Sequence, residues 1–65
     1  MWMVVHMARS QAAAEEVCDC LTKEGLLVRL HPVYRSVASQ DNYYEVRVLE
    51  SEMQEARSIL LERGL

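Results

Sequence analysis

The stretch EVCDCLTKEGLLVRLHPV, residues 16–33, decides the fold. It predicts the end of a helix, a stop at Gly25 and then a strand. Glycine adopts the left-handed backbone conformation that ends a helix without the steric cost of a Cβ atom. The apolar run over residues 26–30 favours a strand, and Leu26 is placed to pack back on the last helical turn, as in a Schellman motif. An alternative use of Gly25 is to let a ligand approach the backbone.

The residues upstream of this stretch predict a strand and the body of the helix. Residues 1–7 are apolar at nearly every position, which indicates a first strand buried on both faces or along its edge. Ser10 is a fair N-cap, because its hydroxyl can accept a hydrogen bond from a free N–H group of the first turn. We expect a helix over residues 11–24, whose inner side carries Ala13, Ala14, Val17, Leu21 and Glu24.

The residues downstream predict a hairpin and a second helix. We expect strands over residues 26–34 and 43–49, joined by a polar hairpin loop over residues 35–42. The third strand alternates apolar and polar residues, which is typical of a strand with one buried face. Across the hairpin, Arg29 is placed to pair with Glu45 if the register allows. Ser51 is expected to cap a helix over residues 52–63, which a glycine then ends.

This order of elements, βαββα, predicts an α+β fold within a single domain of residues 1–65. Both helices would cover one face of a three-stranded antiparallel sheet, which makes a two-layer sandwich. Right-handed crossovers place the strands in the order 1-3-2. The topology is half of a ferredoxin-like fold, in which a fourth strand would lie beside the first.

The first strand is then expected to have an open apolar edge, because the chain stops before a fourth strand. An unpaired edge favours association unless it is covered. We therefore expect a homodimer that joins two first strands into one six-stranded sheet with twofold symmetry. The thin core of a domain this small favours such an assembly. The alternative is that the edge is blunted by its shortness and by the chain terminus.

Composition and charge narrow the classes of function. The formal net charge of −3 argues against nucleic-acid binding, which relies on Lys and Arg to neutralise phosphates. No apolar run is long enough for a transmembrane helix. The N-terminal apolar segment is too short for a signal peptide, and no basic residue precedes it. We expect a cytoplasmic protein without a membrane partner, whose two cysteines are reduced thiols.

Four side chains could carry chemistry: Cys18, Cys20, His6 and His31. A zinc site would need two ligands beyond the cysteine pair at suitable spacing. The histidines lie on strands that the third strand separates, and no nucleophile or orienting carboxylate is identified beside them. We expect packing roles for all four, or a weak pH-sensitive or metal-binding surface made by the histidines. The sequence predicts no catalytic residue, cofactor or metal site.

The sheet face without helices is the candidate interaction surface. Its mixture of one aromatic anchor, arginines and apolar residues is typical of binding surfaces. The alternatives are an ordinary solvated sheet face and a stacking platform for single-stranded nucleic acid, which the acidic net charge disfavours. The residues expected on this face are Trp2, Val4, His6, Leu27, Arg29, His31, Tyr43, Glu45 and Arg47.

Packing and capping motifs along the chain resemble those of a known family. They are Glu16-Val17 leading to Gly25, the apolar strand after it, Val46-Arg47-Val48, and Glu55-Ala56 leading to Ile59-Leu60. Together they resemble a small bacterial domain family of unknown function, described as prokaryotic signal-transducing proteins with a ferredoxin-like or P-II-like half-fold. The resemblance carries no catalytic residue.

Short chains of similar appearance are sometimes labelled glutamate decarboxylase. That activity needs pyridoxal phosphate held by a buried lysine in a large domain. The only lysine, Lys23, is expected on the outer side of its helix. We therefore expect a non-enzymatic protein-interaction or regulatory module. The alternative is a small-molecule or metal sensor with its site at a dimer interface.

Overall fold

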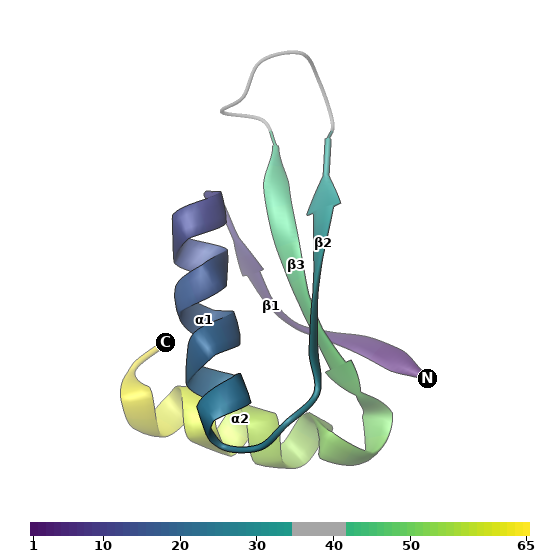
Figure 1. Cartoon of the computed structure of the whole chain (residues 1–65), viewed down its shortest axis with the longest axis vertical. Helices are drawn as coiled ribbons and strands as arrows, with labels where there is room; N and C mark the ends of the chain where they lie inside the picture. Colours follow the sequence, from purple (N-terminus) through teal and green to yellow (C-terminus); the bar gives the residue numbers. More distant parts are fainter. Residues whose placement is uncertain (35–41) are drawn as a thin grey trace.

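Three antiparallel strands and two α-helices make up residues 1–34 and 42–65, which are the residues described by the computed structural model (Figure 1). The sheet order is β1-β3-β2. This arrangement confirms the predicted α+β fold class and strand order. The predicted loop over residues 35–42 lies, apart from Asn42, outside the described residues. The elements, in chain order, are β1 (Trp2–Ala8), α1 (Gln11–Lys23), β2 (Val28–Val33), β3 (Tyr43–Leu49), the 3₁₀ turn η2 (Glu50–Glu52) and α2 (Met53–Arg63).

Local hydrogen bonds set both ends of α1, as predicted. The Ser10 hydroxyl accepts a hydrogen bond from the Ala13 N–H at 3.1 Å. At the other end, Gly25 has a φ of 89°, and the Leu26 N–H donates to the Leu21 carbonyl at 3.2 Å. These are the contacts of a Schellman motif. Because residue 26 completes the helix end, β2 begins at residue 28 and not at residue 26 as predicted.

One buried cluster joins both helices to the inner face of the sheet. The side chains of Leu21, Val46 and Val48 are fully buried. Of the residues predicted for the inner side of α1, Ala13 and Glu24 are exposed, and Cys20 is buried instead. The cluster comprises Ala8, Ala14, Val17, Cys20, Leu21, Leu26, Val46, Val48, Ala56, Ile59 and Leu60.

The second helix begins differently from the prediction. Ser51 does not cap it, because residues 50–52 form the turn η2 and the N-cap is Glu52, which makes no side-chain capping bond. The carboxylate of Glu52 accepts a hydrogen bond from the Leu27 N–H at 3.3 Å instead. The helix ends at Gly64, whose φ of 72° repeats the left-handed stop seen at the end of α1.

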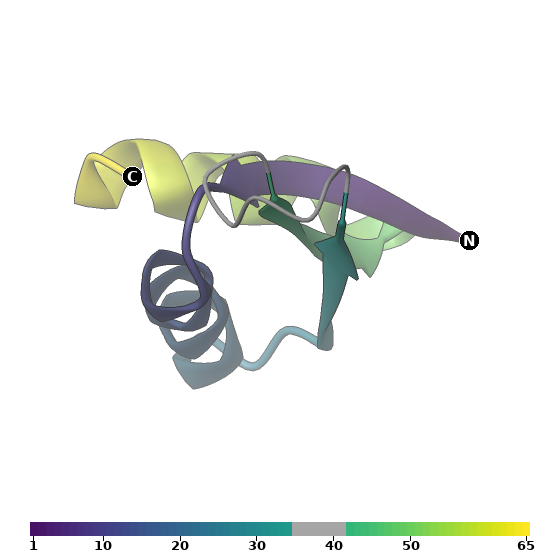
Figure 2. The same ribbon diagram turned by 90° about the horizontal axis from the view of Figure 1, so that it is seen from above.

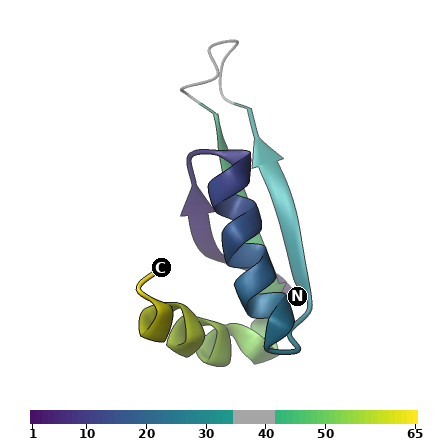
Figure 3. The same ribbon diagram turned by 60° about the vertical axis from the view of Figure 1, so that its left-hand side comes forward.

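The two helices lie on the same side of the sheet and leave its other face open. α1 packs along the hollow of the curved sheet (Figure 2), and α2 crosses below α1 at the end of the strands (Figure 3). The apolar residues of both helices join the core that covers Val46 and Val48. In the described part of the chain, no helix is long and apolar enough to cross a membrane.

A β-bulge in β1 changes which of its residues face the helices. The register pairs Val4 with Arg47 but His6 with Val46, so one residue of β1 is extra. Val46 is a core residue on the helix side, and cross-strand partners share a face of the sheet. His6 therefore does not lie on the open side with Trp2 and Val4, and that part of the prediction is wrong. Met7, paired with Glu45, takes the open side instead.

Candidate functional site

The sheet face opposite the helices is built from rows of residues that run across the three strands. One row is Val4, Arg47 and Arg29, and the next is Met7, Glu45 and His31. Further pairs, Trp2 with Leu49 and Tyr43 with Val33, extend it at both ends. We call this surface the open face. Its residues are Trp2, Val4, Met7, Arg29, His31, Val33, Tyr43, Glu45, Arg47 and Leu49.

A cation–π contact spans the open face from one edge strand to the other. The guanidinium carbon of Arg29, on β2, lies 4.4 Å from the centre of the Trp2 ring, on β1. This distance is well within the roughly 6 Å over which the ring quadrupole attracts a cation. Trp2 is half-buried and Arg29 is exposed. The contact therefore holds a large aromatic ring and an arginine together at the surface of the sheet.

An ion pair within β3 lies beside this contact. Glu45 Oε1 accepts hydrogen bonds from Arg47 Nη2 at 2.6 Å and from Arg47 Nε at 3.1 Å. The two residues are two positions apart, so their side chains lie on the same face of the strand. The predicted pairing of Arg29 with Glu45 is wrong, because the register places Arg29 opposite Arg47 and His31 opposite Glu45.

Most of the predicted face residues are brought together, with two exceptions. The residues that belong to the open face as predicted are Trp2, Val4, Arg29, His31, Tyr43, Glu45 and Arg47. His6 is on the helix side because of the bulge, and Leu27 precedes β2 without a register partner. Alternation along β1 cannot reveal the bulge, since no glycine or other sequence signal marks it. Met7 was therefore missed. Val33 and Leu49 were also not predicted, although alternation along β2 and β3 places them on this face.

The two cysteines lie on α1 and form no disulfide. Cys20 is buried in the core, and Cys18 is half-buried. Burial raises the pKa of the Cys18 thiol above its ordinary value, and the charges of Asp19 and Glu15 raise it further. A raised pKa leaves less thiolate, which is the nucleophilic form, at neutral pH. Cys18 therefore has the character of an unreactive packing thiol.

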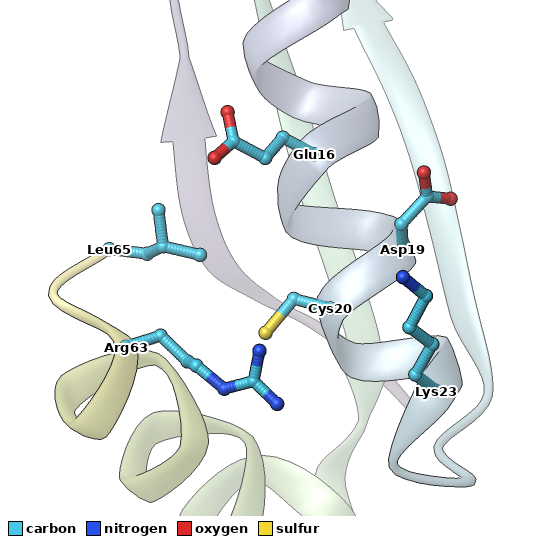
Figure 4. Close-up of a pocket in the computed structure, with 6 residues that line it drawn as sticks. All are labelled: Glu16, Asp19, Cys20, Lys23, Arg63 and Leu65. Carbon is cyan, nitrogen blue, oxygen red and sulfur yellow. The ribbon is translucent and has the colours of Figure 1, made fainter.

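A cleft of about 340 Å³ lies between α1 and the C-terminal end of α2 (Figure 4). The side chains of Cys20 and Arg63 point into the space between the helices. Arg63 Nη2 also lies 3.5 Å from Glu24 Oε2. Acidic and basic groups are balanced around this cleft, so its electrostatics favour no class of ligand. Its lining residues are Glu16, Asp19, Cys20, Lys23, Arg63 and Leu65.

Neither metal ligands nor relatives point to another site. Within residues 1–34 and 42–65, no group of three or more His, Cys, Asp or Glu side chains is arranged to hold a metal ion. Comparisons with protein families, curated proteins and solved structures found no significant match. The open face is therefore the candidate functional site.

Proposed function

We propose that this protein is a small non-enzymatic interaction module that binds a protein partner through the open face. The observation that carries the proposal is the 4.4 Å contact of Arg29 with the Trp2 ring, on a sheet face that neither α1 nor α2 covers. Tryptophan, tyrosine and arginine are the residues that most often dominate the energy of protein interfaces. Their presence together on one face supports a binding role.

The exposed apolar side chains of β1 also favour binding. Val4 and Met7 expose 39% and 52% of their surface on the same face as Trp2. Apolar area along this edge strand, with charged side chains on β3 and β2 beside it, lets the face make both hydrophobic and polar contacts. Because these groups project from paired strands, they are ordered before a partner arrives, which lowers the entropic cost of binding.

The proposal includes a regulatory role in the cytoplasm and a homodimer joined through β1. A reducing compartment would keep the thiols of Cys18 and Cys20 free. The resemblance to prokaryotic signal-transducing proteins supports regulation. No strand among the described residues pairs with the outer edge of β1, which supports the dimer. No observation on the described residues favours the sensor hypothesis, so we do not propose it.

Site-specific photo-crosslinking in cells tests the open face. A photoreactive residue at Val4, on the open face, should capture a protein that the same probe at Ala12, exposed on α1, does not. The captured protein is then purified, and its binding to the wild-type chain is measured directly. Substitutions Trp2→Ala and Arg29→Ala should weaken that binding at least tenfold, whereas Leu61→Ala on α2 should not change it.

Two results would contradict the interaction proposal. One is capture of the same proteins from Val4 and from Ala12, which would show that the open face has no preferred partner. The other is a purified partner whose affinity is unchanged by both Trp2→Ala and Arg29→Ala. Circular dichroism of each variant separates a lost contact from a lost fold.

A further inference from the structure

Two arginines lie directly opposite each other on the open face, an arrangement that is unfavourable unless something offsets it. The register pairs Arg29 of β2 with Arg47 of β3, and like charges in directly opposite positions of a sheet repel. Glu45 offsets the charge of Arg47. In the described part of the chain, the guanidinium of Arg29 contacts the Trp2 ring and no carboxylate.

The acidic residues of the chain lie almost entirely outside the open face. Of its ten acidic residues, Asp41 falls outside the described residues and only Glu45 belongs to the open face. The open face carries two arginines, one glutamate and His31. It is therefore locally basic on an acidic protein. The other eight acidic residues lie in the helices, the η2 turn or their caps: Glu15, Glu16, Asp19, Glu24, Glu50, Glu52, Glu55 and Glu62.

We infer that the open face binds an acidic segment of a protein partner, whose carboxylates pair with Arg29 and Arg47. This inference rests on the proposed function and names the chemistry of the partner. Arginine presents its N–H donors in a planar fork that matches a carboxylate. One arginine of this face already pairs with a carboxylate, because Glu45 Oε1 accepts hydrogen bonds from Nη2 and Nε of Arg47.

The geometry indicates how such a segment would be held. A carboxylate placed between the opposite arginines would relieve their repulsion, and charge-assisted hydrogen bonds are about twice as strong as neutral ones. The apolar surface of Trp2, Val4 and Met7 lies on the β1 side of these arginines. The partner segment would therefore combine acidic residues with apolar ones.

An acidic peptide fits this face better than a nucleic acid does. Binding to a phosphate backbone relies on several Lys and Arg side chains, which neutralise phosphates and so displace the counterions of the nucleic acid. The open face has two arginines, and Glu45 already offsets one of them. The net charge of −3 would also repel a polyanion longer than the face. A short segment with a few carboxylates contacts the arginines without the repulsion that a long polyanion would experience.

The test compares short capped peptides that differ only in charge. The probe alternates glutamate and leucine, the matched peptide alternates glutamine and leucine, and a single-stranded oligonucleotide is the third ligand. Affinity is followed by Trp2 fluorescence, and the site is mapped by amide chemical shifts. The glutamate peptide should bind the open face at least tenfold more tightly than the glutamine peptide. The difference should shrink as salt rises.

Variants of the face give opposite effects on this preference. Arg29→Gln and Arg47→Gln should each lower affinity for the glutamate peptide about tenfold, because each removes a charge-assisted contact. Glu45→Gln should raise it severalfold, because it frees Arg47 from its internal carboxylate. An increase of this kind cannot come from loss of folding. The matched control is Arg57→Gln, an exposed position on α2.

The outcomes separate the inference from the proposed function. Equal binding of the glutamate and glutamine peptides to the open face would overturn the inference and leave an interaction face intact. Preferred binding of the oligonucleotide through Arg29 and Arg47 would overturn the acidic-peptide assignment. If the glutamate peptide shifts amides only outside the open face, the inference fails, and the crosslinking experiment alone then decides the proposed function.

Discussion

Arg29 stabilises the open face through its contact with an aromatic ring. The chain has one tryptophan, so the contact has an unambiguous optical signal. We predict that Arg29→Ala shifts Trp2 emission to longer wavelength, because the ring loses the side chain 4.4 Å above it. The free energy of unfolding should fall by about 0.5–1 kcal/mol, the range for an exposed cation–π pair. Fluorescence and urea unfolding measure the two effects.

The matched variant for this prediction is Arg57→Ala, which removes the same type of side chain from an exposed position on α2. It should leave Trp2 emission unchanged. Emission from Arg29→Ala identical to that of the wild-type chain would show that the stacked geometry does not persist in solution.

Cys18 links protein stability to alkaline pH. Its pKa in the folded protein is raised above the ordinary value of 9.0, mainly by burial. Because the folded state holds the thiol proton more tightly, this contribution to stability is complete below pH 9.0 and is lost as the pH rises through the folded pKa. We predict that Cys18→Ala reduces the loss of stability above pH 9.0. Urea unfolding as a function of pH measures it.

The comparison between Cys18→Ala and the wild-type chain is needed because other groups of the chain also contribute to the pH dependence of stability. Their contributions are common to both proteins and cancel in the difference. A difference in stability that stays constant from neutral to alkaline pH would contradict the predicted role of the thiol.

At the scale of elements, the stop at Gly25 decides how α1 passes into β2. Its φ of 89° is unfavourable for a residue with a Cβ atom, although nothing lies within 4 Å of where that atom would be. The cost of Gly25→Ala is therefore backbone strain alone, about 1–2 kcal/mol. Gly25→Asn should cost less, since asparagine tolerates the left-handed region. Urea unfolding of both variants, with Ser58→Ala on α2 as control, tests this order.

The packing of α2 can be tested with two neighbouring leucines. Leu60 is 5% exposed and Leu61 is 82% exposed. The change to alanine has the same intrinsic effect on the helix in both cases, so the difference isolates burial. Leu60→Ala should cost about 2–5 kcal/mol, and Leu61→Ala within about 0.5 kcal/mol. Equal costs from urea unfolding would mean that α2 does not pack as the structure shows.

The loss at Leu60 is large compared with the stability of a chain of this size. A globular protein is stable by about 0.05–0.15 kcal/mol per residue, which is roughly 3–10 kcal/mol for 65 residues. Leu60→Ala can therefore leave part of the population unfolded in water. Circular dichroism without denaturant would detect this fraction directly.

Helix ends that are set by neighbouring residues could be predicted from the sequence. Features that depend on contacts between distant parts of the chain could not. Ser10 and Gly25 act on the turns next to them, so the ends of α1 followed from residue type. The turn η2 takes the place of the expected cap at Ser51, and Glu52 in this turn accepts a hydrogen bond from the backbone of the distant Leu27. Such a contact exists only after the chain has folded.

The open face shows the same division between local and distant causes. Strict alternation identified Arg29, His31, Glu45 and Arg47 correctly, because β2 and β3 pair without a shift. In β1 the bulge reverses, after Val4, which residues of the alternation face the helices. Only the pairing with β3 determines where the bulge lies. The cation–π contact spans two edge strands that are not neighbours, so no sequence spacing could predict it.

At the scale of the whole molecule, the two edges of the sheet differ. β2 carries Pro32, which has no N–H to donate to an added strand. β1 has no proline, but its bulge interrupts the backbone between Val4 and His6. Edge bulges are one way in which proteins prevent association. The proposed dimer must therefore pair β1 on one side of the bulge, which favours weak association at high concentration.

We predict that the chain sediments with the mass of two copies at high micromolar concentration and of one copy when diluted. Amide hydrogen exchange in β1 should slow as concentration rises, while exchange in β2 should not change. Met7→Lys should restore the monomer, because a charge on an edge strand opposes pairing. Glu45 lies opposite Met7, so its carboxylate can pair with the added lysine within the monomer.

The matched control for the dimer is Leu61→Lys, which adds the same charge at an exposed position on α2 and should leave the mass of two copies unchanged. This comparison separates an edge effect from a general effect of net charge on association. A mass of one copy at every concentration would remove the dimer. If amide protection from hydrogen exchange rises in β2 instead, the contact lies on the opposite edge of the sheet. Pro32 would then limit strand pairing to the positions of β2 that keep their N–H groups.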